Sequence, residues 1–281
     1  MERIQSAIQK AREARQDQTD IVSAAQSSAP RVPEMDHKSE ASVADAVNQR
    51  WSELDNIRLS SHQLQKARIV AVEANSQAAS FDVLRTRMLH QMNANNWRRV
   101  AIASAGAACG KTTLCLNLAF GLARQRSIKV LVIDLDMRRP TIGKLLQPEM
   151  DNNFADALEG RSAPEAHLIC YEQRLAFATN TKPVANSAEL LQDKDAAHVI
   201  DDMEARYQPD VMLFDTPPML ACDDTIAFLD QIDCVMLVAA AESTTAEEIT
   251  KCQREISARS NLMGVVLNKC RYLEKTDSYG Y

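Results

Sequence analysis

Six continuous apolar runs, separated by amphipathic stretches, dominate the chain between residues 99 and 269. Runs without in/out alternation are typical of strands buried on both faces, as in parallel sheets. The predicted strands cover 99–104, 129–136, 174–180, 211–216, 234–241 and 262–269. Apolar residues at helical spacing predict helices between them, at 112–126, 187–206, 223–230 and 245–259. This alternation predicts a doubly wound α/β fold, with a mostly parallel sheet and helices on both faces.

Helix-start signals refine this pattern at two places. An amphipathic helix begins near residue 77, just before the first predicted strand. The last predicted helix opens with a capping-box pattern, Thr244 followed by Glu247. Because ligands bind at the carboxyl ends of strands in such folds, the strand ends are where we expect the functional residues.

The N-terminal quarter of the chain has a different character. Residues 1–17 predict a short amphipathic helix, which we interpret as a docking element, and residues 18–40 are rich in Ser, Pro and Gln, which favours a flexible linker. A second apolar stripe that includes Trp51 predicts a helical extension. We therefore expect five parts: 1–17, 18–40, 41–76, a main domain at 77–270, and a C-terminal tail at 271–281.

Composition narrows the class of protein. The 281 residues include 46% hydrophobic and 25% charged residues, as soluble globular domains do, and only 7 Gly, which disfavours a turn-rich β protein. The net charge of −6 disfavours nucleic-acid binding. Seven scattered Cys without a C-x-x-C pair predict reduced thiols in the cytoplasm. No apolar run approaches the ~18 residues of a membrane span, so we expect any membrane contact to go through a partner.

Tyrosines are unevenly distributed. Of the 5 in the chain, three lie in the last ten residues: Tyr272, Tyr279 and Tyr281. Even scatter would place about 0.2 there, and at this point a flexible, adhesive tail would also explain the cluster.

The strongest chemical motif is AGAACGKTT at 105–113, between a predicted strand and a predicted helix. It fits the phosphate-binding P-loop (Walker A) pattern, in which successive backbone N–H groups cradle phosphates. Lys111 would reach the β- and γ-phosphates, and the Thr112 hydroxyl would bind Mg²⁺. The predicted nucleotide-binding residues are Ala105, Gly106, Ala107, Ala108, Cys109, Gly110, Lys111, Thr112 and Thr113.

A second motif, LVIDLDMRRP at 131–140, places Asp134 and Asp136 on the same side of a strand end. Two carboxylates beside a phosphate loop can hold a metal ion or accept a proton from a nucleophile. The adjacent Arg138 and Arg139 either neutralise phosphate or are solvated, and the sequence favours neither interpretation.

Two further strand ends carry polar residues. VMLFDTPP at 211–218 ends a buried strand with Asp215, and an acid there is costly unless a cation is near, which favours a place at the Mg²⁺ site. GVVLNK at 264–269 places Asn268 at the next strand end, where its amide suits a purine edge or, equally, a turn.

Over residues 77–281, the chain resembles the bacterial tyrosine kinases of capsule and exopolysaccharide systems. The resemblance rests on SAGAACGKTT, VLVIDLDMRRP, VMLFDTPP, GVVLNK and the tyrosine-bearing end. The head, MERIQSAIQKAREAR, is similar to cytosolic members that accompany a separate membrane protein. The resemblance implies a P-loop NTPase fold and an ATP-dependent, non-receptor protein-tyrosine autokinase. It also implies a cytoplasmic enzyme that is peripheral to the inner membrane through a chain-length protein (a polysaccharide co-polymerase) as activator. A homo-oligomer and a cognate tyrosine phosphatase are implied as well.

The resemblance also implies residue roles. Lys111 holds ATP, Thr112, Asp136 and Asp215 organise Mg²⁺, and Asp134 accepts the tyrosine proton, although the two strand carboxylates are interchangeable at this point. The implied acceptors are Tyr279, Tyr281 and then Tyr272.

The chain departs from the family pattern at three places, one of which is the tail, where three tyrosines stand instead of a dense cluster. The family loop usually reads P-G-E-G-K, whereas Ala107, Ala108 and Cys109 precede Gly110 here. The oligomerisation pattern E-x-x-R-x-x-R falls on 79–85 and retains only its last arginine, Arg85.

Two other functions compete with the kinase. A partitioning-type P-loop ATPase would carry an additional Lys where Gly106 stands and would lack the tyrosine tail. A nucleotide-gated scaffold for the membrane polysaccharide co-polymerase would bind ATP without significant phosphorylation.

Overall fold

The computed structural model describes residues 37–146 and 153–271. The predicted helix at 1–17, most of the predicted linker and the three tail tyrosines lie outside these residues. The chain divides between Asp45 and Ala46, inside helix α2 (His37–Ser52), and the first unit contributes only the beginning of that helix to the described residues. The second unit contains everything that follows.

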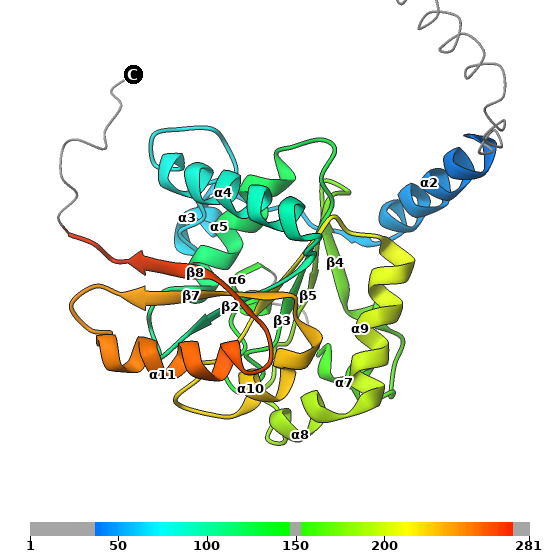
Figure 1. Cartoon of the computed structure of the whole chain (residues 1–281). Coiled ribbons are helices and arrows are strands. Elements are labelled where there is room, and N and C mark those ends of the chain that lie inside the picture. The colour runs from blue at the N-terminus through cyan, green and yellow to red at the C-terminus, as the bar shows by residue number, and fades with distance from the viewer. Residues whose placement is uncertain (1–36, 147–152, 272–281) are drawn as a thin grey trace, which may run out of the picture. The chain divides into compact units, whose positions relative to one another are not determined.

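An eight-stranded sheet forms the centre of the second unit (Figure 1). Its order is β1 (Asp55–Asn56), β4 (Leu168–Tyr171), β5 (Leu175–Ala178), β3 (Val130–Asp134), β6 (Val211–Asp215), β2 (Arg99–Ser104), β7 (Cys234–Ala240) and β8 (Asn261–Asn268). All neighbouring pairs are parallel except β4 and β5, which are antiparallel. The six predicted strands and the mostly parallel sheet are confirmed. Strands β1 and β4, which are only 2 and 4 residues long, are not among the predicted strands.

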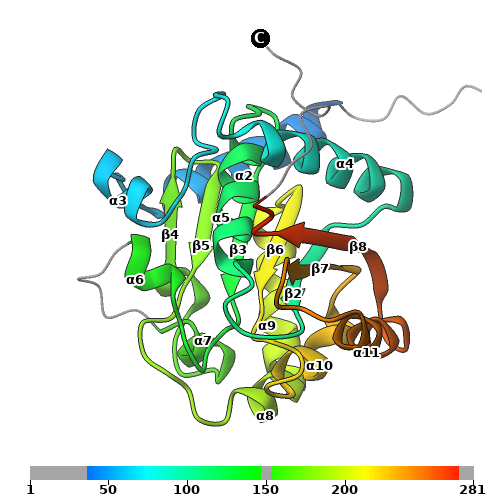
Figure 2. The same cartoon turned by 90° about the vertical axis from the view of Figure 1, so that its left-hand side faces the viewer.

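Helices cover both faces of this sheet, as predicted (Figure 2). One apolar core joins the sheet to α4 (Ala79–Asn95) and α5 (Lys111–Ala123), and the other joins it to α9 (Lys194–Tyr207) and α11 (Ala246–Ser257). Successive strand residues point to opposite cores, which is why these strands have no polar face. Shorter helices complete the unit: α3 (Ser61–Lys66), α6 (Ile142–Leu146), α7 (Ala155–Leu158), η1 (Pro164–His167), α8 (Ser187–Gln192), α10 (Asp224–Phe228) and η2 (Leu229–Gln231).

Two helix predictions need correction. The stretch 187–206 forms two helices, α8 and α9, because Asp193 adopts an extended conformation and caps α9 through a bond from the Asp195 N–H. The capping box of α11 uses Thr245 and Glu248, one residue later than predicted. The Thr244 hydroxyl instead accepts a hydrogen bond from the N–H of Ala240.

The sequence of the extension expected at 41–76 favours a helix packed on the main domain over a helix for a partner, and the packing is confirmed. Helix α2 begins at His37, inside the expected linker, because no Gly or Pro follows Pro33 to stop a helix there. The extension also contributes strand β1 to the edge of the sheet. Trp51 is fully buried, and its indole N–H donates a 2.7 Å hydrogen bond to the carbonyl of Tyr207 in α9. Residues 46–76 therefore pack as part of the main domain.

In the part of the chain that the structure describes, none of the helices combines the length and the apolar character that crossing a membrane requires.

Candidate active site

The phosphate-binding loop connects β2 to the N-terminus of α5, as predicted. Gly110 precedes α5 with φ +91°, and a Cβ there would lie 2.4 Å from Nδ2 of Asn268, so only glycine fits. The same Nδ2 donates a 2.8 Å hydrogen bond to the carbonyl of Cys109. Asn268 at the end of β8 therefore holds the loop. Its Oδ1 accepts a hydrogen bond from the N–H of Lys269. The predicted contact of its amide with a purine stays a prediction.

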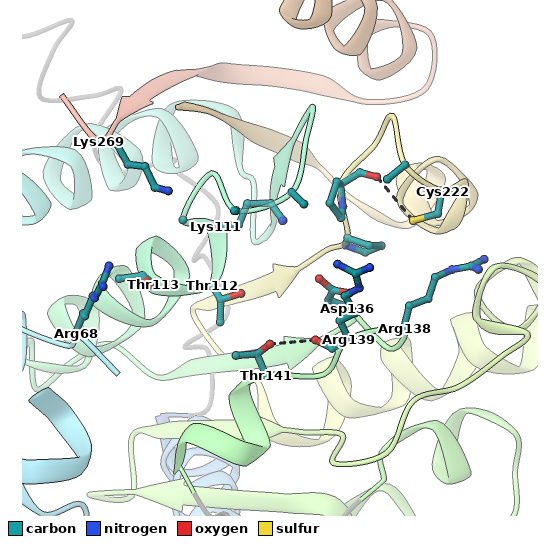
Figure 3. Close-up of a pocket in the computed structure, with 16 residues that line it drawn as sticks. Arg68, Lys111, Thr112, Thr113, Asp136, Arg138, Arg139, Thr141, Cys222 and Lys269 are labelled. Carbon is teal, nitrogen blue, oxygen red and sulfur yellow. Dashed lines mark hydrogen bonds between the residues drawn. The ribbon is translucent and has the colours of Figure 1, made fainter. Parts of the chain in front are cut away.

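A pocket of about 580 Å³ opens beside this loop (Figure 3). Seven predicted residues line it: Ala107, Ala108, Gly110, Lys111, Thr112, Thr113 and Asp136. The other predicted residues are not among its lining residues: Ala105, Gly106, Cys109, Asp134, Asp215 and Asn268. The sequence analysis assigned no role to several lining residues: Arg68, Thr141, Pro217, Pro218, Ala221, Cys222 and Lys269. Lys269 directly follows Asn268, so its place at a strand end was a usable signal, whereas nothing in the sequence near Arg68 points to the site.

Thr112 and Asp215 are joined at the centre of the site. The Thr112 hydroxyl donates a 2.6 Å hydrogen bond to Oδ2 of Asp215. The other oxygen, Oδ1, is buried and has no hydrogen-bond partner among the described residues. Burial raises the pKa of Asp215 to about 6, although the charge of Lys111 and the bond from Thr112 act to lower it. A buried, half-satisfied carboxylate beside a phosphate loop suits a cation.

The two strand carboxylates differ in environment. Asp134 is fully buried, and its oxygens accept from the N–H groups of Asp136 and Ile142, each at 3.2 Å. Burial, and then the charges of Asp215 and Asp136, raise its pKa well above the ordinary value. Asp136 lines the pocket, where burial raises its pKa and the positive charge of Lys111 opposes the rise.

Both arginines after these carboxylates line the pocket, and they differ in their partners. Arg138 Nε donates a 2.8 Å hydrogen bond to Oδ2 of the fully buried Asp224, which also accepts from the Ser187 hydroxyl. Arg139 lines the pocket and has no ion-pair partner among the described residues. Arg138 is thus held in place by a carboxylate, and the charge of Arg139 acts to lower the pKa of Asp136. Neutralisation of phosphate by either arginine stays a prediction.

The residues present fit a magnesium-bound nucleotide. Within the described ranges, no three His, Cys, Asp or Glu side chains converge as a preformed metal site. Mg²⁺ does not need one, because it is usually held by one or two carboxylates together with waters and substrate phosphates. The carboxylates of Asp136 and Asp215 and the Thr112 hydroxyl suit such an ion, and the loop N–H groups and Lys111 suit the phosphates.

Comparisons with known proteins agree with this geometry. The family model for the AAA domain matches residues 97–262. Tyrosine-protein kinase YwqD of Bacillus subtilis is 30% identical over 222 residues, which cover 78% of this chain and 92% of that one. The chain belongs to the family of bacterial tyrosine-protein kinases. The kinase domain of the Escherichia coli tyrosine kinase ETK superposes with a TM-score of 0.65 at 26% identity, covering 81% of this chain and 93% of that one.

Some relatives of this kinase are much longer. A Klebsiella pneumoniae protein named for its place in the cps region is 27% identical over 240 residues, which are 85% of this chain and 31% of that one.

The family assignment favours the kinase over the partitioning-type ATPase and the scaffold. Gly106 agrees, because it stands where the ATPases carry their additional Lys.

In this kinase, the arginine at the end of the family's oligomerisation pattern, Arg85, makes contacts within its own chain. Arg85 Nη1 donates a 2.9 Å hydrogen bond to the carbonyl of Gly121 and lies 3.1 Å from Asp82. Asp82 also pairs with Arg124 of the same chain. The one arginine retained from the oligomerisation pattern is therefore occupied within its own domain.

Proposed function

We propose that this protein is an ATP-dependent protein-tyrosine autokinase that phosphorylates tyrosines of its own C-terminal tail and thereby regulates exopolysaccharide or capsule synthesis and export. The observation that carries the proposal is the Thr112–Asp215 pair, with its unpartnered buried oxygen, at the mouth of a phosphate loop in a member of the tyrosine-kinase family. ATP and Mg²⁺ are the proposed cofactors.

In the proposed reaction, the phenol oxygen of a tail tyrosine attacks the γ-phosphorus of ATP. The bond to the β–γ bridging oxygen breaks, ADP leaves, and the phenol proton passes to a carboxylate. Such a transfer needs mainly positioning and stabilisation of charge. Lys111 and the loop N–H groups hold the phosphates, while Thr112, Asp136 and Asp215 hold Mg²⁺, which when bound neutralises charge on the phosphate oxygens.

Asp134 remains our proposed base. Burial, and then the charges of Asp215 and Asp136, raise the pKa of Asp134 well above the ordinary value, so its carboxylate binds a proton more tightly than an exposed aspartate does. Asp136 suits the metal better, since it lines the pocket beside Lys111. Tyr279 and Tyr281, and then Tyr272, are the proposed acceptors.

The proposed partners follow from the family. We propose a membrane chain-length protein as activator, which would bring a cytoplasmic enzyme to the inner membrane, and a cognate tyrosine phosphatase that reverses the modification. A homo-oligomer would allow one copy to phosphorylate its neighbour, although Arg85 is not free to form it.

The test is incubation with Mg-ATP, followed by intact mass and anti-phosphotyrosine detection. The wild type, with the activating segment of the membrane partner present, should gain about 80 Da per phosphate. Lys111→Met and the triple variant Tyr272→Phe, Tyr279→Phe, Tyr281→Phe should both lose the signal. ATP turnover without tyrosine phosphate would favour the partitioning-type ATPase, and nucleotide binding without turnover would favour the scaffold.

A further inference from the structure

Arg68 reaches the pocket from outside the predicted motifs. It follows α3, and Figure 3 shows it on the side of the pocket where Thr113 and Lys269 lie, away from Asp136 and Arg139. Its side chain is exposed, and no carboxylate pairs with it in the described ranges. An unpaired guanidinium therefore lines one side of the phosphate loop.

The backbone of Arg68 is strained for an arginine. Its φ is +55°, and the end of α3 is closed by hydrogen bonds from Arg68 N–H to Gln65 O (3.0 Å) and from Ile69 N–H to Leu64 O (2.9 Å). These bonds form a Schellman end, whose left-handed residue is usually glycine. Another residue there costs about 1 kcal/mol. The helix end alone would therefore favour glycine at position 68.

A buried asparagine fixes this segment to the P-loop helix. Asn117 of α5 is fully buried, and its Oδ1 accepts from the N–H groups of Val70 (2.8 Å) and Ala71 (3.1 Å). Its Nδ2 donates to the carbonyls of Arg68 (2.9 Å) and Thr113 (2.8 Å). Every hydrogen-bonding group of the amide is used. Asn117 thus joins the backbone of Arg68 directly to the turn of α5 that carries Thr112 and Thr113.

We propose that Arg68 is a nucleotide-affinity residue, which binds the phosphate chain on the side remote from the transferred phosphate, and that Asn117 is its positioning residue. The proposal rests on the proposed function, because it assumes that the pocket binds ATP. Asp136 and Arg139 mark the side where transfer takes place, so the phosphate oxygens nearest Arg68 belong to the part that ATP and ADP share. Arg68 therefore contributes equally to the binding of both nucleotides.

The experiment measures the dissociation constants of Mg-ATP and Mg-ADP by titration calorimetry. Arg68→Ala and Arg68→Gly should both bind each nucleotide about tenfold more weakly, the loss expected for one charge-assisted contact at an exposed site. Arg87→Ala, at an exposed arginine of α4 that does not line the pocket, should bind as the wild type does. The KM for ATP should rise in Arg68→Ala without a change in kcat.

Stability separates a binding role from a structural one. Arg68→Gly relieves the strained backbone and should unfold at a higher temperature than the wild type, while it binds nucleotide more weakly. A gain in stability with unchanged affinity for both nucleotides would overturn the proposal. So would a loss confined to ATP, since that would place the contact on the γ-phosphate.

A double-mutant cycle tests Asn117. Asn117→Ala should weaken binding about as much as Arg68→Ala, with no further loss when the two are combined. Additive losses would overturn its positioning role, and if Asn117→Ala does not fold, the Arg68 variants decide alone. Lys111→Met separates the two proposals. If the wild type does not bind Mg-ATP, the proposed function is overturned. If Lys111→Met loses affinity for Mg-ATP while Arg68→Ala keeps the full affinity, only the inference about Arg68 is overturned.

Discussion

The hydroxyl of Thr112 and the carboxylate of Asp215 are joined by a 2.6 Å hydrogen bond between the first turn of α5 and the end of β6. The bond satisfies one oxygen of a buried acid and leaves the other without a partner among the described residues. The protein therefore keeps an incompletely satisfied carboxylate at its phosphate loop, an arrangement that favours binding of a cation at the expense of stability.

Asp215 should make the protein less stable as the pH rises through its pKa. Its pKa is raised from 3.8 to about 6, so the folded state holds the proton more tightly than the unfolded state. Its contribution to stability is then greatest below pH 4 and is lost progressively between pH 4 and pH 6. A rise of two pKa units corresponds to about 3 kcal/mol in the free energy of unfolding at low pH. Between pH 5.0 and pH 7.5 the protein should lose about 1 kcal/mol of this contribution.

Urea unfolding of wild type and Asp215→Asn at these two pH values measures this effect. Asp215→Asn should be more stable than the wild type at pH 7.5. The difference in its free energy of unfolding between the two pH values should be about 1 kcal/mol smaller than in the wild type. Its kinase activity should disappear. Asp202→Asn, at an exposed position, is the control and should follow the wild type. An equal pH dependence in all three proteins would contradict the raised pKa.

The two strand carboxylates should have separable roles. Asp134→Asn should lower kcat by about 100-fold or more with little change in Mg-ADP affinity, because a proton acceptor is lost while the ligands remain. Asp136→Asn should weaken nucleotide binding in Mg²⁺ and have little effect in EDTA. Calorimetry with and without Mg²⁺, together with steady-state kinetics, distinguishes them. The reverse pattern would exchange the two assignments.

The sequence was sufficient for the six predicted strands because a parallel sheet requires uninterrupted apolar runs. It also placed Lys111, Thr112 and Asp136 in one pocket, since the motifs that contain them follow β2 and β3, the two strands on either side of β6. It could not place Arg68, whose position depends on a hydrogen bond from Asn117 across a long separation in sequence. Strand β1 could not be predicted from the sequence either, because two residues are too few to show a periodic pattern.

Ala108→Gly should stabilise the protein by about 1 kcal/mol. Ala108 has φ +58°, a left-handed conformation that costs a non-glycine residue about that much, and the family pattern has glycine at this place. Ala107→Gly is the matched control: it lies in the same loop without a positive φ and should lose about 0.5–1 kcal/mol through backbone entropy. Thermal unfolding compares the two. Destabilisation by both substitutions would show that the strain at Ala108 is negligible.

Arg85 should act on stability rather than on assembly. Its side chain is only 16% exposed and contacts both Asp82 and the carbonyl of Gly121, so Arg85→Ala removes an ion pair and a hydrogen bond from within the domain. We expect a loss of about 1–2 kcal/mol in the free energy of unfolding, with the oligomeric state unchanged. Light scattering after gel filtration and urea unfolding measure the two quantities, with the exposed Arg87→Ala of the same helix as control. Dissociation of an oligomer by Arg85→Ala at unchanged stability would mean that this arginine leaves its own domain to bind a neighbouring copy.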